Sequence, residues 1–148
     1  LTNTFSYGRW NLMIFFSGQK GAKVYNNTAN ALFLKGSLRN ARNVTNEAGR
    51  SPENPFNPGS VSTRFLESGD FIRLSNLNLS YAFDMKNRII KGLTVFATGQ
   101  NLALFTKYSG IDPEVNVDKN INGIPSKGFD YTQYPRPIIL SFGVNMAF

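Results

Sequence analysis

Two sets of oxygen-bearing side chains have a spacing that could support chemistry, and both lie in the Gly- and Pro-rich stretch 105–136. Asp112 and Glu114 are close enough in sequence to serve as the carboxylate pair of a glycoside hydrolase. Pro113 between them and the turn residues around them favour another role, in which both carboxylates fix the loop or a contact that the loop makes. Serine-based catalysis is excluded because the chain contains no His. The sequence therefore predicts a protein that is not an enzyme.

The second set is a partial calcium motif in the same stretch. Asp118, Asn120 and Asn122 stand at positions 1, 3 and 5 of an EF-hand loop, and Gly123 stands at position 6. Position 12 is Phe129 where an EF-hand has Glu, and no helical pattern flanks the loop. Asn-Gly is also a common turn dipeptide. The sequence therefore favours a turn within a loop, and it predicts neither a metal site nor a cofactor.

Aromatic side chains in the same stretch are the remaining candidates for ligand contact. Aromatic rings present large faces that can stack on sugar rings or on peptide side chains. The residues that we single out for contact with a ligand or a covering protein are Tyr108, Phe129, Tyr131 and Tyr134. The alternative is that these rings pack the loops together or form an aromatic girdle at a membrane surface.

The formal net charge of +7 comes from basic residues that are scattered through loop-like stretches. Examples are Arg39, Arg42, Arg50 and Arg64 in one stretch, and Lys86, Arg88 and Lys91 in another. A nucleic-acid surface would gather such residues on one face among stacking aromatic rings. We therefore predict solvated loops that contact anionic lipid headgroups, and no nucleic-acid partner.

Composition and hydrophobic period indicate strands as the elements that position these loops. The chain has 13 Phe, 6 Tyr and 1 Trp, only 17% charged residues, and no apolar run long enough for a membrane helix. Period-2 alternation predicts five strands, at 1–7, 10–17, 71–83, 92–101 and 138–148. Short turns join them at 8–9 and 84–91, and long loops at 21–62, with a short helix near 29–38, and at 105–136.

The last strand has the strongest pattern, because apolar side chains occupy every second position up to the final residue. Its length matches the 9–11 residues of a tilted transmembrane strand. A soluble strand with one buried face would alternate similarly, but a strand that ends on Phe fits the closing strand of an outer-membrane barrel better. The apolar positions are Ile138, Leu140, Phe142, Val144, Met146 and Phe148.

The other face of the predicted strands is polar, as expected for the inside of a transmembrane barrel. We predict that Asn76, Asn78, Thr94, Thr98, Ser141 and Asn145 face the lumen, some of them touching a plug rather than a substrate. Barrels of this kind have short periplasmic turns and long extracellular loops. That pattern predicts a periplasmic carboxyl terminus and extracellular positions for both long loops.

Three separated blocks of the chain resemble, in this order, the C-terminal end of SusC/RagA-type TonB-linked outer-membrane transporters. They are STRFLESGDFIRLSNLNLSYAF at 62–83, GLTVFATGQNLALFTKYSGIDPEVN at 92–116 and YPRPIILSFGVNMAF at 134–148. The resemblance implies an all-β fold, in which the chain supplies about five antiparallel strands at the C-terminal end of a transmembrane β-barrel of about 22 strands with a plugged lumen. The last strand also resembles the assembly signal that the barrel-assembly machinery reads, carried here by Leu140, Phe142, Val144, Met146 and Phe148.

The same resemblance implies a multi-pass protein of the outer membrane of a Gram-negative bacterium. Transporters of this family import glycans or peptides with a SusD-like surface lipoprotein, and a plug domain and TonB box couple import to TonB. Residues 1–148 contain neither of these two parts, so we expect the chain to be the C-terminal part of one barrel domain, completed by the rest of the barrel and the plug.

Two other architectures remain open from the sequence. Five strands cannot close a barrel, and open strand edges are prohibitive in lipid, so the chain is either a fragment of a larger polypeptide, which we favour, or pairs with other chains. A small autonomous barrel would need about eight strands. A soluble β-sandwich that serves as a carbohydrate-binding module would bury the apolar face in a core and dissolve without detergent.

Overall fold

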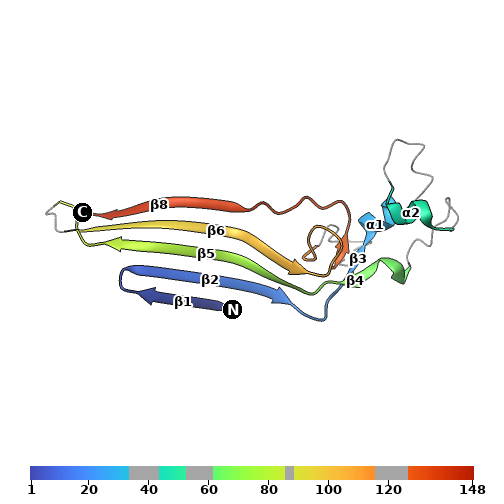
Figure 1. Ribbon diagram of the computed structural model, residues 1–148, viewed down its shortest axis with the longest axis horizontal. Coiled ribbons are helices and arrows are strands. Elements are labelled where there is room, and N and C mark those ends of the chain that lie inside the picture. Colours follow the sequence, from blue (N-terminus) through green and yellow to red (C-terminus); the bar gives the residue numbers. More distant parts are fainter. Residues whose placement is uncertain (34–43, 53–61, 86–88, 116–126) are drawn as a thin grey trace. The chain divides into compact units, whose positions relative to one another are not determined.

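The computed structural model describes residues 1–33, 44–52, 62–85, 89–115 and 127–148. The chain divides into two compact units (Figure 1). The first, which we call the sheet unit, comprises Leu1–Gln19, Phe71–Phe105 and Arg136–Phe148. The second, which we call the loop unit, comprises Lys20–Asp70 and Thr106–Pro135.

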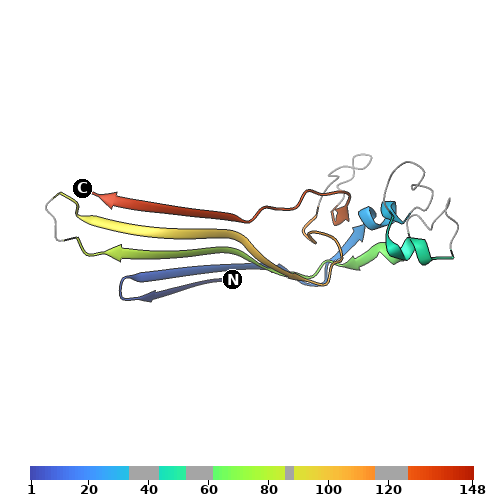
Figure 2. The ribbon, with the colours of Figure 1, turned by 45° about the horizontal axis from the view of Figure 1, so that its top comes forward.

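The sheet unit is one five-stranded sheet with the order β1-β2-β5-β6-β8. The registered pairs β1–β2, β2–β5 and β6–β8 are antiparallel, and the strands run side by side in both views (Figures 1 and 2). The all-β fold class and the five predicted strands are confirmed. The strands are β1 (Thr2–Tyr7), β2 (Trp10–Gln19), β5 (Phe71–Phe83), β6 (Gly92–Thr106) and β8 (Ile139–Ala147).

Side-chain alternation gives this sheet two different faces, because successive residues of a strand point to opposite sides. The register aligns Leu12 with Leu79 on one face, and Thr98 with Ser141 on the other. The apolar side is not covered within the sheet unit: Leu140 is 64% and Phe142 81% exposed. We call this side the apolar face; it carries Trp10, Leu12, Ile14, Leu77, Leu79, Tyr81, Leu93, Val95, Ala97, Leu140, Phe142, Val144 and Met146.

A short connection joins β1 to β2 at one end of the sheet. Gly8 adopts a φ of +58° between β1 and β2, a left-handed conformation that glycine adopts without strain. Next to this turn, Arg9 Nη2 lies 2.9 Å from Asp84 Oδ2, and the Ala82 amide donates to the Arg9 carbonyl. The predicted tight turn at 8–9 is therefore fixed to the end of β5.

The loop unit has secondary structure of its own, although the sequence predicted little beyond loops. Its small sheet has the order β4-β3-β7, with β3–β4 antiparallel and β3–β7 parallel. Strands this short are not visible as periodicity, and their partners lie far apart in the chain. The elements are β3 (Lys23–Asn26), α1 (Asn27–Leu32), α2 (Asn46–Arg50), the 3₁₀ helix η2 (Thr63–Phe65), β4 (Leu66–Ser68) and β7 (Phe129–Asp130).

The helix predicted near 29–38 begins earlier, at Asn27, and ends at Leu32; positions 34–43 lie outside the described residues. Its start is set by Asn26, whose side chain accepts a hydrogen bond from the Ala29 amide at 2.9 Å. Within the described ranges, no helix is long and apolar enough to cross a membrane.

Two small apolar clusters hold the loop unit together. One consists of Val24, Tyr108 and Val115, and the other of Phe33, Ala48 and Phe65. Tyr25 and Phe129, paired across β3 and β7, stack with ring centroids 5.6 Å apart. The two long connections of the chain thus fold against each other.

Candidate transport surface

The six residues that we predicted to face a lumen lie on strands β5, β6 and β8 of the sheet unit. Thr94 is aligned with Asn145, and Thr98 with Ser141. Asn78 Nδ2 donates to Thr98 Oγ1 at 3.4 Å, which joins β5 to β6 on the same side. Alternation therefore gathers Asn76, Asn78, Thr94, Thr98, Ser141 and Asn145 on one side of the sheet, which we call the polar face.

Aromatic and apolar residues interrupt the polar face. Phe96 is aligned with Gly143, and a Cβ atom built on Gly143 would clash with the Phe96 ring. Glycine is therefore required at 143 so that this ring can lie across β8. On β2, Met13 and Phe15 are aligned with the polar residues Asn78 and Asn76. The face offers amide and hydroxyl groups beside apolar surface, a combination that suits contacts with polar organic molecules or with another protein surface.

A buried arginine marks the place where β6 and β8 separate. Arg73 is 4% exposed, and its Nη1 donates to Asn101 Oδ1. The amide group of Asn101 donates in turn to the carbonyls of Arg136 at 3.0 Å and Pro137 at 3.3 Å. Asn101 has a φ of +55°, a left-handed conformation that is uncommon for residues other than glycine. One side chain thus connects β5, β6 and the segment that leads into β8.

Glu67 is the centre of a polar network in the loop unit. It accepts hydrogen bonds from the Ser109 amide at 2.7 Å, the Ser109 hydroxyl at 2.7 Å and Asn26 Nδ2 at 2.9 Å. Burial raises the pKa of Glu67, but the bonds from Ser109 and Asn26 outweigh it, so the pKa is lowered overall. Ionised Glu67 therefore holds β4, β3 and the segment after β6 together.

Tyr108 and Asp130 form a buried pair beside this network. The Tyr108 hydroxyl donates to Asp130 Oδ2 at 2.6 Å, and Thr28 Oγ1 donates to Asp130 Oδ1 at 3.3 Å. The tyrosine is 5% and the aspartate 4% exposed. Burial, followed by the hydrogen bond and charge of Asp130 and the charge of Glu67, raises the pKa of Tyr108. The phenol stays protonated and keeps donating to the carboxylate.

A pocket of about 250 Å³ opens beside these groups in the loop unit. Its most buried polar side chains are Asn26, Asp112 and Asp130, each no more than 4% exposed. Asp112 Oδ1 accepts a hydrogen bond from the Glu114 amide at 2.9 Å, which is the local turn expected for a residue that fixes a loop. The predicted pair Asp112 and Glu114 therefore share one turn.

The four aromatic residues predicted to contact a ligand or a covering protein differ in exposure. Tyr108 is buried, so a ligand would reach its ring only if the loop unit opened. Phe129 is half-buried and stacked on Tyr25. Tyr131 is 46% and Tyr134 86% exposed, so these two present their rings to the surroundings.

The predicted calcium residues Asp118, Asn120, Asn122 and Gly123 lie outside the described residues. Among the residues that the structure does describe, His, Cys, Asp and Glu side chains form no group of three or more that could hold a metal ion.

Comparison with known proteins gives the chain its relatives. No protein-family model matches it. TonB-dependent receptor P26 of Formosa agariphila is 30% identical over 162 residues, an alignment that covers 99% of this chain. TonB-dependent receptor SusC of Bacteroides thetaiotaomicron is 33% identical over 92 residues, which cover 60% of this chain. The chain is a homologue of SusC/RagA-type TonB-dependent receptors.

A solved structure of the same type agrees with the fold. The RagAB peptide transporter matches over 97% of this chain with a TM-score of 0.66 and 25% identity. The chain spans 16% of that transporter chain and 16% of the Formosa agariphila receptor. The resemblance to SusC/RagA-type transporters, drawn above from three sequence blocks, is confirmed. These relatives are receptors and transporters, in agreement with the prediction that the chain is not an enzyme.

The last strand, predicted to carry an assembly signal, forms one edge of the sheet unit. The proposed signal residues lie on the apolar face of β8 or directly after it, and each is more than half exposed. They are Leu140, Phe142, Val144, Met146 and Phe148. An exposed apolar edge strand would promote aggregation in water, so it needs either lipid or a partner strand.

The sequence did not reveal several of the residues that organise these sites. They are Asn26, Glu67, Arg73, Asn101, Ser109 and Asp130. A charged residue inside an apolar strand and an asparagine inside a strand were available as signals for Arg73 and Asn101. Asn26 caps α1 locally, but its bond to Glu67, like the bonds that join Glu67 to Ser109 and Tyr108 to Asp130, spans at least 22 residues, so local pattern held no signal for these contacts.

Proposed function

We propose that this chain is a wall segment of a TonB-dependent outer-membrane importer that takes up glycans or peptides. The observation that carries the proposal is that one five-stranded sheet has an apolar face and, opposite to it, a polar face. This sheet belongs to a chain that is homologous to TonB-dependent receptors. An uncovered apolar face suits lipid, and a face with Asn, Thr and Ser suits an aqueous lumen. The segment positions polar groups along a transport path and catalyses no reaction.

The sheet requires further strands to function in a membrane. Both edge strands, β1 and β8, offer backbone groups that must be paired in lipid. We infer that the chain is the C-terminal part of one barrel domain of about 22 strands. The remaining strands, the plug and the TonB box belong to other parts of the same importer, and TonB acts through them.

The connections suggest an orientation in the outer membrane of a Gram-negative bacterium. The turn at Gly8 is short, whereas the connections that form the loop unit are long and folded. In transmembrane barrels, short turns are periplasmic and long loops extracellular. We therefore place the carboxyl terminus in the periplasm and the loop unit outside the cell.

The loop unit is the part that we assign to a surface partner. Tyr131 and Tyr134 are exposed there, and tyrosine is enriched at protein interfaces. We infer that they contact a SusD-like lipoprotein or the cargo that it delivers. RagAB is described as a peptide transporter, whereas the residues of this chain do not favour peptides over glycans.

We assign β8 to assembly as well as to lipid contact. The apolar alternation up to Phe148 supports a signal that the barrel-assembly machinery reads before the barrel closes. The same residues then face outer-membrane lipid, so one pattern serves both steps.

The experiment that tests the proposal is fractionation of cells that produce the full-length polypeptide containing this sequence. We expect a heat-modifiable protein, many times larger than 16.5 kDa, that leaves the outer membrane only in detergent. A monomer of 16.5 kDa that is soluble without detergent would contradict the proposal and favour a soluble binding module.

A further inference from the structure

The apolar face of the sheet unit contains a groove of about 650 Å³. One wall is a ladder of aromatic rings, in which Trp10 and Tyr81 lie 4.7 Å apart and Tyr81 and Phe83 also 4.7 Å apart. The opposite wall is formed by Phe142 and Val144 of β8. All of these side chains belong to the sheet unit, so the groove is a property of that unit alone.

The groove exists because the middle strand carries smaller side chains than its neighbours. Outward positions of β6 are Val95 and Ala97, which are aligned with Val144 and Phe142 of β8. Phe96, between them in sequence, has its ring on the polar face, where it requires glycine at 143. A groove lined by apolar and aromatic side chains of four strands suits a hydrocarbon chain.

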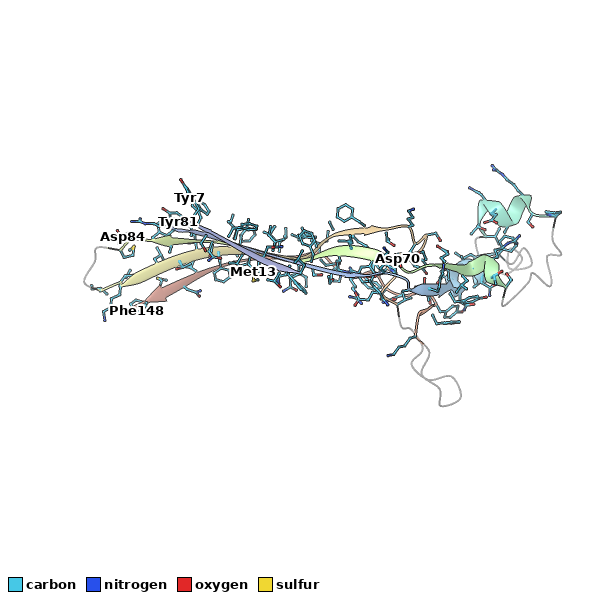
Figure 3. The ribbon with its side chains drawn as sticks, turned by 90° about the horizontal axis from the view of Figure 1, so that it is seen from below. Tyr7, Met13, Asp70, Tyr81, Asp84 and Phe148 are labelled. Carbon is cyan, nitrogen blue, oxygen red and sulfur yellow. The ribbon has the colours of Figure 1, made fainter. Side chains whose placement is uncertain are left out.

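A pair of charged residues lies near one end of the groove. Arg9 and Asp84 are the sequence neighbours of the lining residues Trp10 and Phe83, and they form an ion pair at 2.9 Å. Their side chains are 51% and 57% exposed, so both charges remain in contact with water. Figure 3 shows Tyr81 and Asp84 together at this end of the sheet. An apolar groove with a cation and an anion near one end matches a molecule with a hydrocarbon tail and a zwitterionic head.

A second copy of the sheet would fit this surface less well. A flat protein partner on the groove would cover the Arg9–Asp84 pair and take both charges out of water, which costs more than the pair regains unless new partners are supplied. A phospholipid headgroup leaves the pair solvated, with its phosphate near Arg9 and its ammonium near Asp84. Inside a bilayer, such binding depends on close packing and on these polar contacts, because lipid chains are as apolar as the groove.

We propose that this groove retains the acyl chain of one zwitterionic phospholipid of the phosphatidylethanolamine class, with its headgroup at the Arg9–Asp84 pair. The inference rests on the proposed membrane function, since it needs the apolar face to lie in lipid. It adds a specific lipid site to that face, distinct from the surrounding fluid lipid.

The test is native mass spectrometry of the full-length receptor in a non-ionic detergent with added phosphatidylethanolamine or phosphatidylglycerol. Wild-type receptor retains one phosphatidylethanolamine in preference to phosphatidylglycerol. Ala97→Trp fills the groove and loses the bound lipid, while Arg9→Gln keeps a lipid but loses the preference for the zwitterionic headgroup. The control is Leu77→Trp, which places the same indole ring on the apolar face outside the groove and retains the lipid.

Heat-modifiable migration on gels checks that each variant forms a barrel, and Ala97→Phe replaces Ala97→Trp if the larger residue prevents folding. Retention of phosphatidylethanolamine by the filled groove at the wild-type level overturns the proposal. Loss of a dimer in Ala97→Trp, without any change in bound lipid, overturns it in favour of a second copy on the groove. Absence of wild-type receptor from the outer membrane is a separate failure, which refutes the proposed function itself.

Discussion

Replacement of Asn101 by alanine is expected to loosen the start of β8 without unfolding the sheet. Asn101 accepts a hydrogen bond from the buried Arg73 and donates to the carbonyls of Arg136 and Pro137. Loss of a bond to a buried charged group costs about 1.5–3 kcal/mol. A φ of +55° without glycine or asparagine adds about 1 kcal/mol. The expected local cost is therefore about 2.5–4 kcal/mol.

Hydrogen–deuterium exchange of the full-length receptor measures this cost at the amides of 138–141. Because each 1.4 kcal/mol is a factor of ten, exchange there is expected to become about 60-fold to several hundredfold faster in Asn101→Ala. Gln100→Ala is the matched control: its side chain is exposed and adjacent, and exchange should remain near the wild-type rate. Asn101→Asp keeps an acceptor for Arg73 but loses the donor to the two carbonyls, so it should fall between wild type and alanine.

Wild-type exchange rates in Asn101→Ala would refute this reasoning, because the bonds would then contribute nothing to the position of β8. Asn101→Gly separates the two causes, since glycine removes the bonds but tolerates the backbone conformation. If Asn101→Gly restored wild-type rates, backbone strain rather than hydrogen bonding would be responsible.

Three further predictions concern the loop unit and the polar face. Tyr108→Phe removes the bond to Asp130 and should lower the local stability of the loop unit by about 1.5–3 kcal/mol. Limited proteolysis of 106–135 should then be faster. Because the pKa of Tyr108 is raised above its ordinary 10.0, this proteolysis should also accelerate in wild type as pH rises above 10.0, and not in Tyr108→Phe. The pKa of Glu67 is lowered from its ordinary 4.5, so its contribution is complete above pH 4.5 and is lost as pH falls through the lower folded value; Glu67→Gln should remove this acid dependence, and an unchanged acid profile would contradict it. Gly143→Val should clash with Phe96 and reduce the yield of heat-modifiable barrel, and the double variant with Phe96→Ala should recover it.

The sheet unit was predictable because its information is local. Alternation along β5, β6 and β8 assigned Asn78, Thr98 and Ser141 to one face before any register was known, and the structure aligns Thr98 with Ser141. In β2 the alternation was weak, and Met13 and Phe15 do lie opposite polar residues there. A face that must be apolar along a whole strand leaves a strong signal in the sequence.

The loop unit was not predictable for the opposite reason. Tyr25 pairs with Phe129, and Glu67 bonds to Ser109, across segments far apart in the chain. Strands of two to four residues give too few positions for a period to be detected. For the same reason the burial of Tyr108 was missed: its partner Asp130 lies 22 residues away and belongs to one of these short strands.

The central claim is that the two faces of the sheet meet different solvents, and neighbouring positions on β8 test it directly. The chain contains no cysteine, so Val144→Cys and Asn145→Cys can carry single spin labels in a full-length receptor without other cysteines, reconstituted in lipid vesicles. Electron paramagnetic resonance then compares collisions of each label with oxygen, which partitions into lipid, and with a water-soluble nickel chelate. The account predicts that oxygen dominates at 144 and the nickel chelate at 145; equal access of the nickel chelate to both positions would contradict it.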